Sequence, residues 1–287
     1  MNFTLIIWLS SFAFGLQTII GKLTSKYSLQ NPWLLNFFWT SFNLILTAII
    51  ASFFGINLPG NLTPYIVAGF FLAIGNILLT YSIYTLDVTV ISPLFALRTA
   101  FTAIIGVLFL KEHFSVLQYL MIIIIFLSGL LIRIDEKFSL KKSMRDLWLG
   151  VACMFFLSVS SATIKIASVN SGYWNNVFWI NLFTSMFLLL TIPKFIKDIK
   201  STLITRYIGA LGYSLTGGIG RLLMFFGLAS NVTVTTAVTS LPLSMIITIP
   251  LAYIFPQLLE KHTTKIYVIR LILATIMIGC SIKLSLR

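Results

Sequence analysis

Charged residues are scarce in this sequence. Of its 287 residues, 9% are Asp, Glu, Lys or Arg, 58% are hydrophobic, and the mean hydropathy is +1.00. A soluble globular chain carries about 25% charged residues. The sequence therefore has too little polar surface to be solvated by water, which argues against a soluble enzyme or a nucleic-acid-binding protein.

The sequence has only two cysteines, and it lacks the features of a cleavable signal peptide. Cys153 and Cys280 both fall inside apolar segments without a paired spacing, so we expect neither a disulfide framework nor a metal site. The first apolar segment, 3–20, has no basic residue before it and no small-residue cleavage pattern after it. We expect this segment to be retained, and we expect no cofactor.

Long apolar runs recur from one end of the sequence to the other. Each is long enough to cross a hydrocarbon core of about 30 Å as a helix, and none alternates as a barrel strand would. We predict ten spans, near 3–20, 32–53, 64–84, 88–110, 116–134, 147–168, 173–192, 206–229, 234–256 and 262–283. Most basic residues of this +13 chain lie between spans, where membrane lipids are their expected partners and nucleic acid is not.

Similar residues recur in the same order in two halves of the chain. The charged stretch 135–146 separates a first half, 1–134, from a second half, 147–287. The corresponding marks are Lys22 and Lys165, 36–39 and 176–179, 75–78 and 220–223, and 110–113 and 259–262. Compositional likeness of apolar helices is the alternative explanation. Because five is odd, the second half must enter the membrane from the opposite side, giving two inverted five-helix repeats around a central cavity.

Several of these segments resemble the drug/metabolite transporter superfamily, specifically its ten-span EamA-type members. The resemblance rests on the pattern 8–22, on the block 88–94 continuing through 106–112, and on the small residues at 128–131. It implies an all-α integral membrane transporter with both termini in the cytoplasm. We expect its location to be the cytoplasmic (inner) membrane of a prokaryote.

Two arginines fall deep inside predicted spans. At 1.5 Å per residue, Arg98 lies about 15 Å from the nearer end of its predicted span, and Arg221 lies about 12 Å from the nearer end of its own. An arginine at the bilayer centre costs roughly 3 kcal/mol, so it favours a water-filled cavity or a partner. We expect both to bind substrate, together with Asn76, the repeat counterpart of Arg221. The alternatives are a cap on carbonyls near Pro93 for Arg98 and a helix-packing hydrogen bond for Arg221.

A polar face recurs on the first and sixth spans. Thr18 and Lys22 share one face of the first span, and Ser161 and Lys165 share one face of the sixth. We place these four residues in the substrate site; interhelical packing and lysines that reach the interface are the alternative interpretation. Pro93 and Pro242 lie within predicted spans and are candidate hinges.

No Asp or Glu lies inside a predicted span. A buried carboxylate relay for protons is therefore unsupported, and two central cations favour a small-molecule substrate that carries a carboxylate or phosphate. The leading hypothesis is a secondary transporter that works by alternating access. A flippase or exporter for a lipid-linked or amphipathic substrate is the alternative. An intramembrane enzyme would need a catalytic constellation within the spans, and none is present.

The charge distribution and the family resemblance disagree about orientation. Thirteen basic residues lie on the side of the loops after spans 1, 5, 7 and 9, and four lie on the other: Lys111, Lys165, Lys283 and Arg287. The positive-inside rule makes the first side cytoplasmic and leaves both termini outside. The family resemblance instead implies that both termini lie in the cytoplasm.

Overall fold

The structure, a computed structural model, describes residues 3–86, 88–131, 144–168, 172–254 and 264–285. Within these ranges the longer helices are α1 (Phe3–Tyr27), α2 (Pro32–Phe54), α3 (Thr63–Thr85), α4 (Val88–Leu110), α5 (Val116–Leu131), α6 (Met144–Ala167), α7 (Tyr173–Leu189), α9 (Tyr207–Ser230), α10 (Val232–Thr239), α11 (Leu243–Ile254) and α12 (Thr264–Ser285). Helices occupy all ten segments predicted to be spans, which confirms the all-α fold class. Most of the predicted linker, 135–143, lies outside the described residues.

Seven apolar segments of the described helices are long enough to cross a bilayer. They are Phe3–Tyr27, Pro32–Phe54, Thr63–Thr85, Trp148–Ala167, Ile204–Ser230, Val232–Leu251 and Tyr267–Leu284. Leu94–Leu110 and Val116–Ser128 are shorter apolar helices. A lipid-embedded backbone has no water to bond with, so the helix, which satisfies its N–H and C=O groups internally, is the form that these runs adopt.

Local signals in the sequence set the ends of α2. The Asn31 side chain accepts a hydrogen bond from Trp33 N at 2.9 Å, and Pro32 occupies the first turn, where a missing N–H costs nothing. The helix ends at Phe54, and the residue after it, Gly55, has a positive φ of 79° that glycine adopts without strain.

The ninth predicted span is not one continuous helix. α10 ends at Thr239 and α11 begins at Leu243, so the helix is interrupted at Pro242, one of the two candidate hinges. Pro242 has no N–H to offer the carbonyl four residues earlier, that of Val238. Ser11 Oγ on α1 donates to this carbonyl at 2.8 Å. Leu241 N also donates to it, at 3.3 Å, so a neighbouring helix and the break itself share the acceptor that the proline releases.

The connection from α7 to α9 contains short helices that the sequence did not predict. These are η1 (Ile192–Lys194), α8 (Ile196–Ser201) and η2 (Ile204–Arg206). Phe195 is buried against Phe37 of α2, with ring centroids 5.0 Å apart. Asn31 Nδ2 donates to Asp198 Oδ2 at 2.5 Å. The connection is therefore fixed to the turn between α1 and α2.

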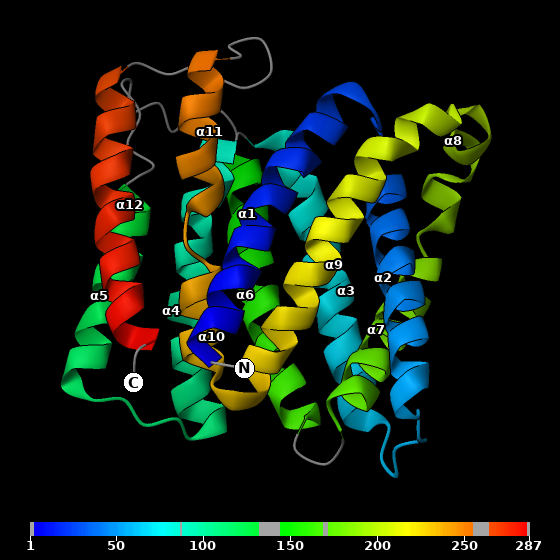
Figure 1. Ribbon diagram of the computed structural model, residues 1–287, viewed down its shortest axis with the longest axis horizontal. Helices are drawn as coiled ribbons and strands as arrows, with labels where there is room; N and C mark the ends of the chain where they lie inside the picture. The colour runs from blue at the N-terminus through cyan, green and yellow to red at the C-terminus, as the bar shows by residue number, and fades with distance from the viewer. Residues whose placement is uncertain (1–2, 87, 132–143, 169–171, 255–263, 286–287) are drawn as a thin grey trace.

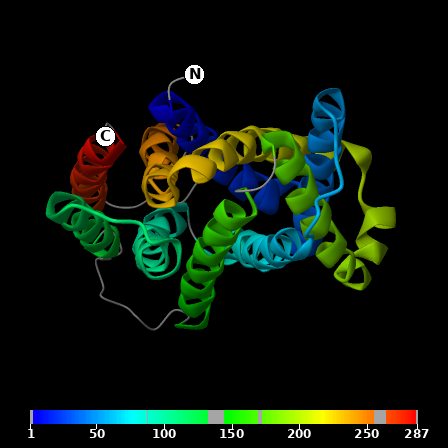
Figure 2. The same ribbon diagram turned by 90° about the horizontal axis from the view of Figure 1, so that it is seen from below.

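The helices form an elongated bundle (Figures 1 and 2). α5 pairs with α12 at one end, and α2 pairs with α7 at the other. In the middle, α1 packs most extensively on α9, and α3 packs most extensively on α6. Sequence-distant helices therefore supply the contacts at the centre of the molecule.

Glycines permit the closest of these helix contacts. A Cβ atom added at Gly75 of α3 would lie 2.7 Å from Leu157 of α6, and one at Gly220 of α9 would lie 3.1 Å from Phe14 of α1. At Gly69 of α3 it would lie 2.9 Å from the backbone nitrogen of Thr184 on α7. Small residues let membrane helices approach closely and gain van der Waals contact, which holds a lipid-solvated bundle together.

Glu112 joins the end of α4 to the start of α10. Its carboxylate accepts hydrogen bonds from Thr233 Oγ1 at 2.5 Å and from Val232 N at 3.2 Å. An anion is favoured at a helix N-terminus, where N–H groups are unsatisfied and the dipole is positive. Gly106 leaves room for this carboxylate, since a Cβ there would lie 2.6 Å from Glu112 Oε2.

Candidate functional site

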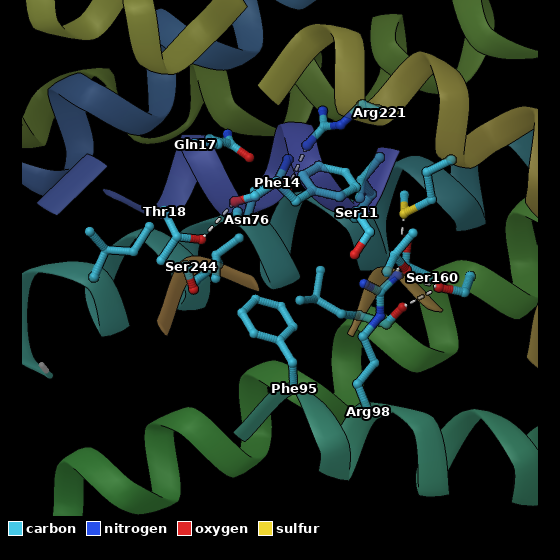
Figure 3. A pocket seen from close by; sticks show the side chains of 18 of the residues that line it. Ser11, Phe14, Gln17, Thr18, Asn76, Phe95, Arg98, Ser160, Arg221 and Ser244 are labelled. Carbon is cyan, nitrogen blue, oxygen red and sulfur yellow. Dashed lines mark hydrogen bonds between the residues drawn. The ribbon is translucent and has the colours of Figure 1, made fainter. Parts of the chain in front are cut away.

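A cavity lies where α1, α3, α4, α6 and α9 meet at the centre of the bundle (Figure 3). Aromatic and aliphatic side chains make up much of its wall, including Phe14, Trp39, Phe95 and Tyr213. Its polar lining consists of Ser11, Gln17, Thr18, Asn76, Arg98, Ser160, Ser161, Arg221, Thr239 and Ser244. The wall thus combines apolar surface with a limited set of hydrogen-bonding groups, as small-molecule sites do.

The cavity is narrow in this structure. Its volume is about 60 Å³, and a single water needs roughly 10–15 Å³ on the same measure. There is space for a few water molecules, so a metabolite would enter only after side chains or helices moved.

Arg98 reaches the cavity from α4. Its Nη2 donates to Ser161 Oγ at 2.9 Å and contacts Met224 Sδ at 3.5 Å, while its buried Nε has no acceptor in the described part of the chain. Ser158 Oγ on α6 donates to the Arg98 backbone oxygen at 3.0 Å and fixes the two helices together at this level. The side chain is 5% exposed, so its charge lies out of bulk solvent with one donor unused.

Arg221 reaches the cavity from α9, on the other side in Figure 3. Its Nη2 donates to Asn76 Oδ1 at 2.9 Å, and its Nη1 lies 3.5 Å from Asn181 Oδ1. The guanidinium also stacks over the Trp39 ring at 4.3 Å from the centroid. Amide oxygens and an aromatic face therefore hold this cation in a fixed position.

Neither guanidinium has a carboxylate partner among the described residues. Hydrogen bonds to neutral groups orient the two charges without neutralising them. Two unneutralised cations in an environment of low dielectric constant give the cavity a positive potential. An anion entering it would be attracted and would find donors already in place.

The structure brings together five of the seven residues predicted to bind substrate. Thr18, Asn76, Arg98, Ser161 and Arg221 all line the cavity. Thr18 Oγ1 donates to the Phe14 backbone oxygen at 2.9 Å, as a hydroxyl within a membrane helix commonly does.

The two lysines lie outside the cavity wall, beyond its ends. Lys22 Nζ donates to Leu86 O at 2.8 Å and to Ile83 O at 3.4 Å, where α3 ends. Lys165 Nζ donates to Ser230 O at 3.0 Å and also to Ala229 O, where α9 ends. Both ammonium groups satisfy carbonyls that a helix C-terminus leaves without a donor.

The two predicted hinges have different surroundings. The backbone of α4 is helical from Val88 to Leu110, through the position of Pro93. Pro242 instead lies in the break between α10 and α11. Thr239, the last residue of α10, and Leu241, within the break, both line the cavity.

Sequence reasoning missed part of the site. Gln17 and Trp39 reach across to Gly217 of α9, where an added Cβ would lie 2.0 Å from Gln17 Nε2 and 2.8 Å from Trp39 Nε1. The missing side chains of the glycines at 217, 218 and 220 leave room for the close approach of another helix or of a ligand. The groups that use this space come from α1 and α2. In sequence, a single Gln or Trp in an apolar run has no signal that separates it from other span residues.

Comparison with known proteins identifies the family. Residues 3–134 match the profile of the EamA-like transporter family. The N-terminal half of the chain therefore belongs to this family. This EamA-like protein is therefore an integral, multi-pass membrane transporter of a small molecule and not an enzyme, as the sequence predicted.

The fold of this EamA-like transporter extends over its whole length. One solved crystal structure superposes on 97% of the chain and on 94% of its own chain, with a TM-score of 0.71 and 11% sequence identity. At this identity the likeness concerns the fold alone. A comparison with curated proteins found no match.

Proposed function

We propose that the protein is a secondary transporter that moves a small metabolite with a carboxylate or phosphate group by alternating access. Arg98 and Arg221 carry this proposal, because they are two buried cations at one cavity that no described carboxylate neutralises. A buried charge without a counter-charge is expensive in a membrane protein, and a ligand that supplies the missing charge accounts for its presence.

Helix packing supports ten spans in two inverted five-helix repeats. When α1 is exchanged for α6 and α3 for α9, the α1–α9 pair becomes the α6–α3 pair, and these are the two most extensive contacts of the bundle. The same exchange swaps α2 with α7 and α5 with α12. Both are packed pairs, so each pair is preserved. Two similar halves of opposite orientation can interchange their conformations and expose a central site to each side in turn.

The two lysines support a closed cavity at both ends. Lys22 on α1 bonds the end of α3, and Lys165 on α6 bonds the end of α9. Each lysine therefore connects the packed α1–α9 pair to the packed α3–α6 pair. The turn after α1 and the end of α6 lie at opposite ends of the bundle (Figure 1). We assign Lys22 and Lys165 as end clamps of the site, with Arg98, Arg221, Asn76, Thr18 and Ser161 as its substrate-facing groups.

Uptake into proteoliposomes tests the substrate class. We expect Arg98→Gln and Arg221→Gln to abolish uptake of the transported anion, because each variant removes one of the two charges at the cavity. Arg206→Gln is the matched control, since Arg206 is an exposed residue of η2, away from the cavity. Uptake of every carboxylate and phosphate tested that is unchanged in both cavity variants would overturn the proposal.

A further inference from the structure

We propose, on the basis of the transport function above, that the Asn76 amide N–H group is a specificity-determining donor for the substrate anion, and that Arg221 positions it. Asn76 is 1% exposed and lines the cavity. Its Oδ1 accepts from Arg221 Nη2 at 2.9 Å, whereas its Nδ2 has no acceptor among the residues that the structure describes. The unused group on this wall of the site is therefore a donor.

Arg221 determines which end of the amide is unused. A guanidinium carries only donors, so the amide must turn its oxygen toward it. Rotation of the Asn76 amide by 180° would bring two sets of N–H groups into contact and forfeit a charge-assisted hydrogen bond. The cation thus holds the Asn76 NH2 in one orientation, which removes the usual ambiguity between the two ends of an asparagine amide.

A buried donor without an acceptor raises the free energy of the folded protein unless a ligand accepts its hydrogen bond. Leaving such a group unsatisfied costs about 1–3 kcal/mol. Arg98 Nε on α4 and Ser160 Oγ on α6 also line the cavity, and both are buried without a hydrogen-bond partner among the described residues. Unsatisfied donors thus lie on two sides of the cavity, on α3 and on α4 and α6. A ligand with acceptor oxygens would satisfy both sides.

Asn181 supplies a matched control. It also directs its Oδ1 at Arg221, at 3.5 Å, but it does not line the cavity. An aspartate at either position would place a carboxylate beside Arg221 and neutralise its charge. Asn76→Asp also converts the cavity donor into an acceptor, whereas Asn181→Asp leaves that donor in place.

Thermal shift in detergent, followed by uptake kinetics, tests the assignment. Acetate, benzoate, inorganic phosphate and glycerol 3-phosphate serve as probes, because a ligand that binds the folded state raises its melting temperature. Each variant is compared with its own ligand-free melting temperature, so a change in intrinsic stability does not enter. For the anion that stabilises the wild type most, we expect Asn76→Asp to weaken binding and raise KM by about tenfold or more.

The control variants are expected to separate the roles. Asn181→Asp neutralises the Arg221 charge but keeps the Asn76 donor, so it should raise KM by at least about threefold less than Asn76→Asp does. Arg221→Lys, which lacks the planar fork, should raise KM with little change in Vmax. Equal losses in Asn76→Asp and Asn181→Asp would show that the anion senses only the Arg221 charge, and no loss in either would remove Asn76 from the site. Both outcomes overturn the assignment. If no anion binds or is transported by the wild type, the substrate class itself is wrong.

Discussion

Replacing Lys22 or Lys165 by methionine should open the cavity toward opposite sides of the membrane. Lys22 bonds the end of α3 and Lys165 bonds the end of α9, and each bond connects helices that belong to different packed pairs. Methionine keeps an apolar stem of similar length and removes the ammonium. Each variant therefore loses the connection at one end of the cavity and keeps it at the other.

The size of the effect follows from the hydrogen bonds that are lost. A hydrogen bond from a charged donor contributes about 1.5–3 kcal/mol net. We take the lower value, because both lysines are partly exposed and one of the Lys22 bonds is long at 3.4 Å. A loss of about 1.5 kcal/mol corresponds to a shift of roughly tenfold toward the state that is open at that end.

Labelling of one cavity cysteine from each side measures this shift. Ser160→Cys, with Cys153 and Cys280 replaced by alanine, places a thiol in the wall at a hydroxyl that bonds no other described residue. A membrane-impermeant thiol reagent is then added to one face of oriented vesicles. Lys22→Met should raise labelling about tenfold from the side of the α1–α2 turn, and Lys165→Met from the other side.

Lys197→Met is the control for this assay. Lys197 is an exposed residue of α8, near the same turn as Lys22, and its substitution should leave labelling unchanged from both sides. Increased labelling from the same side in both clamp variants, or unchanged labelling in both, would refute the assignment of the lysines as end clamps.

Further predictions concern stability, measured as thermal unfolding in detergent. Gly69→Ala should destabilise the protein by about 1–3 kcal/mol, because the new Cβ would lie 2.9 Å from backbone on α7; Gly60→Ala, which meets no atom within 4 Å, should be neutral. Glu112→Gln should cost about 1–2 kcal/mol by removing the anion at the start of α10, and a melting temperature equal to wild type would contradict this. Lys111→Gly should stabilise by about 0.5–1 kcal/mol, because Lys111 has a φ of 54°; no gain would show that the lysine side chain compensates for the strain.

The positions of the helices were largely predictable because apolar length decides them. A run that is long enough to span hydrocarbon becomes a helix whatever its neighbours are. The short helices around α8 were not predicted, since their residues are fixed by Phe195 packing on α2 and by the Asn31–Asp198 bond. Those contacts join segments more than 150 positions apart, and nothing local marks them.

The two arginines of the site could be predicted from the sequence because charged residues are rare within apolar runs. Arg98 and Arg221 are conspicuous in apolar runs, and both line the cavity. Lys22 and Lys165 seemed equally suitable by spacing, but each lies nearer a helix end, where its long stem reaches free carbonyls before it reaches the centre. Trp39 and Gln17 were missed because their role depends on Gly217 of a distant helix.

The hydroxyl of Ser11 couples hydration to movement. It occupies the Val238 carbonyl only while α1 lies against the break between α10 and α11. If α1 withdraws, that carbonyl keeps the long bond from Leu241 N at 3.3 Å but loses the hydroxyl, and within a membrane water or a polar ligand group can replace it. Separation of these helices therefore costs less when water or a ligand fills the cavity, so an empty, dry transporter has a thermodynamic reason to stay shut.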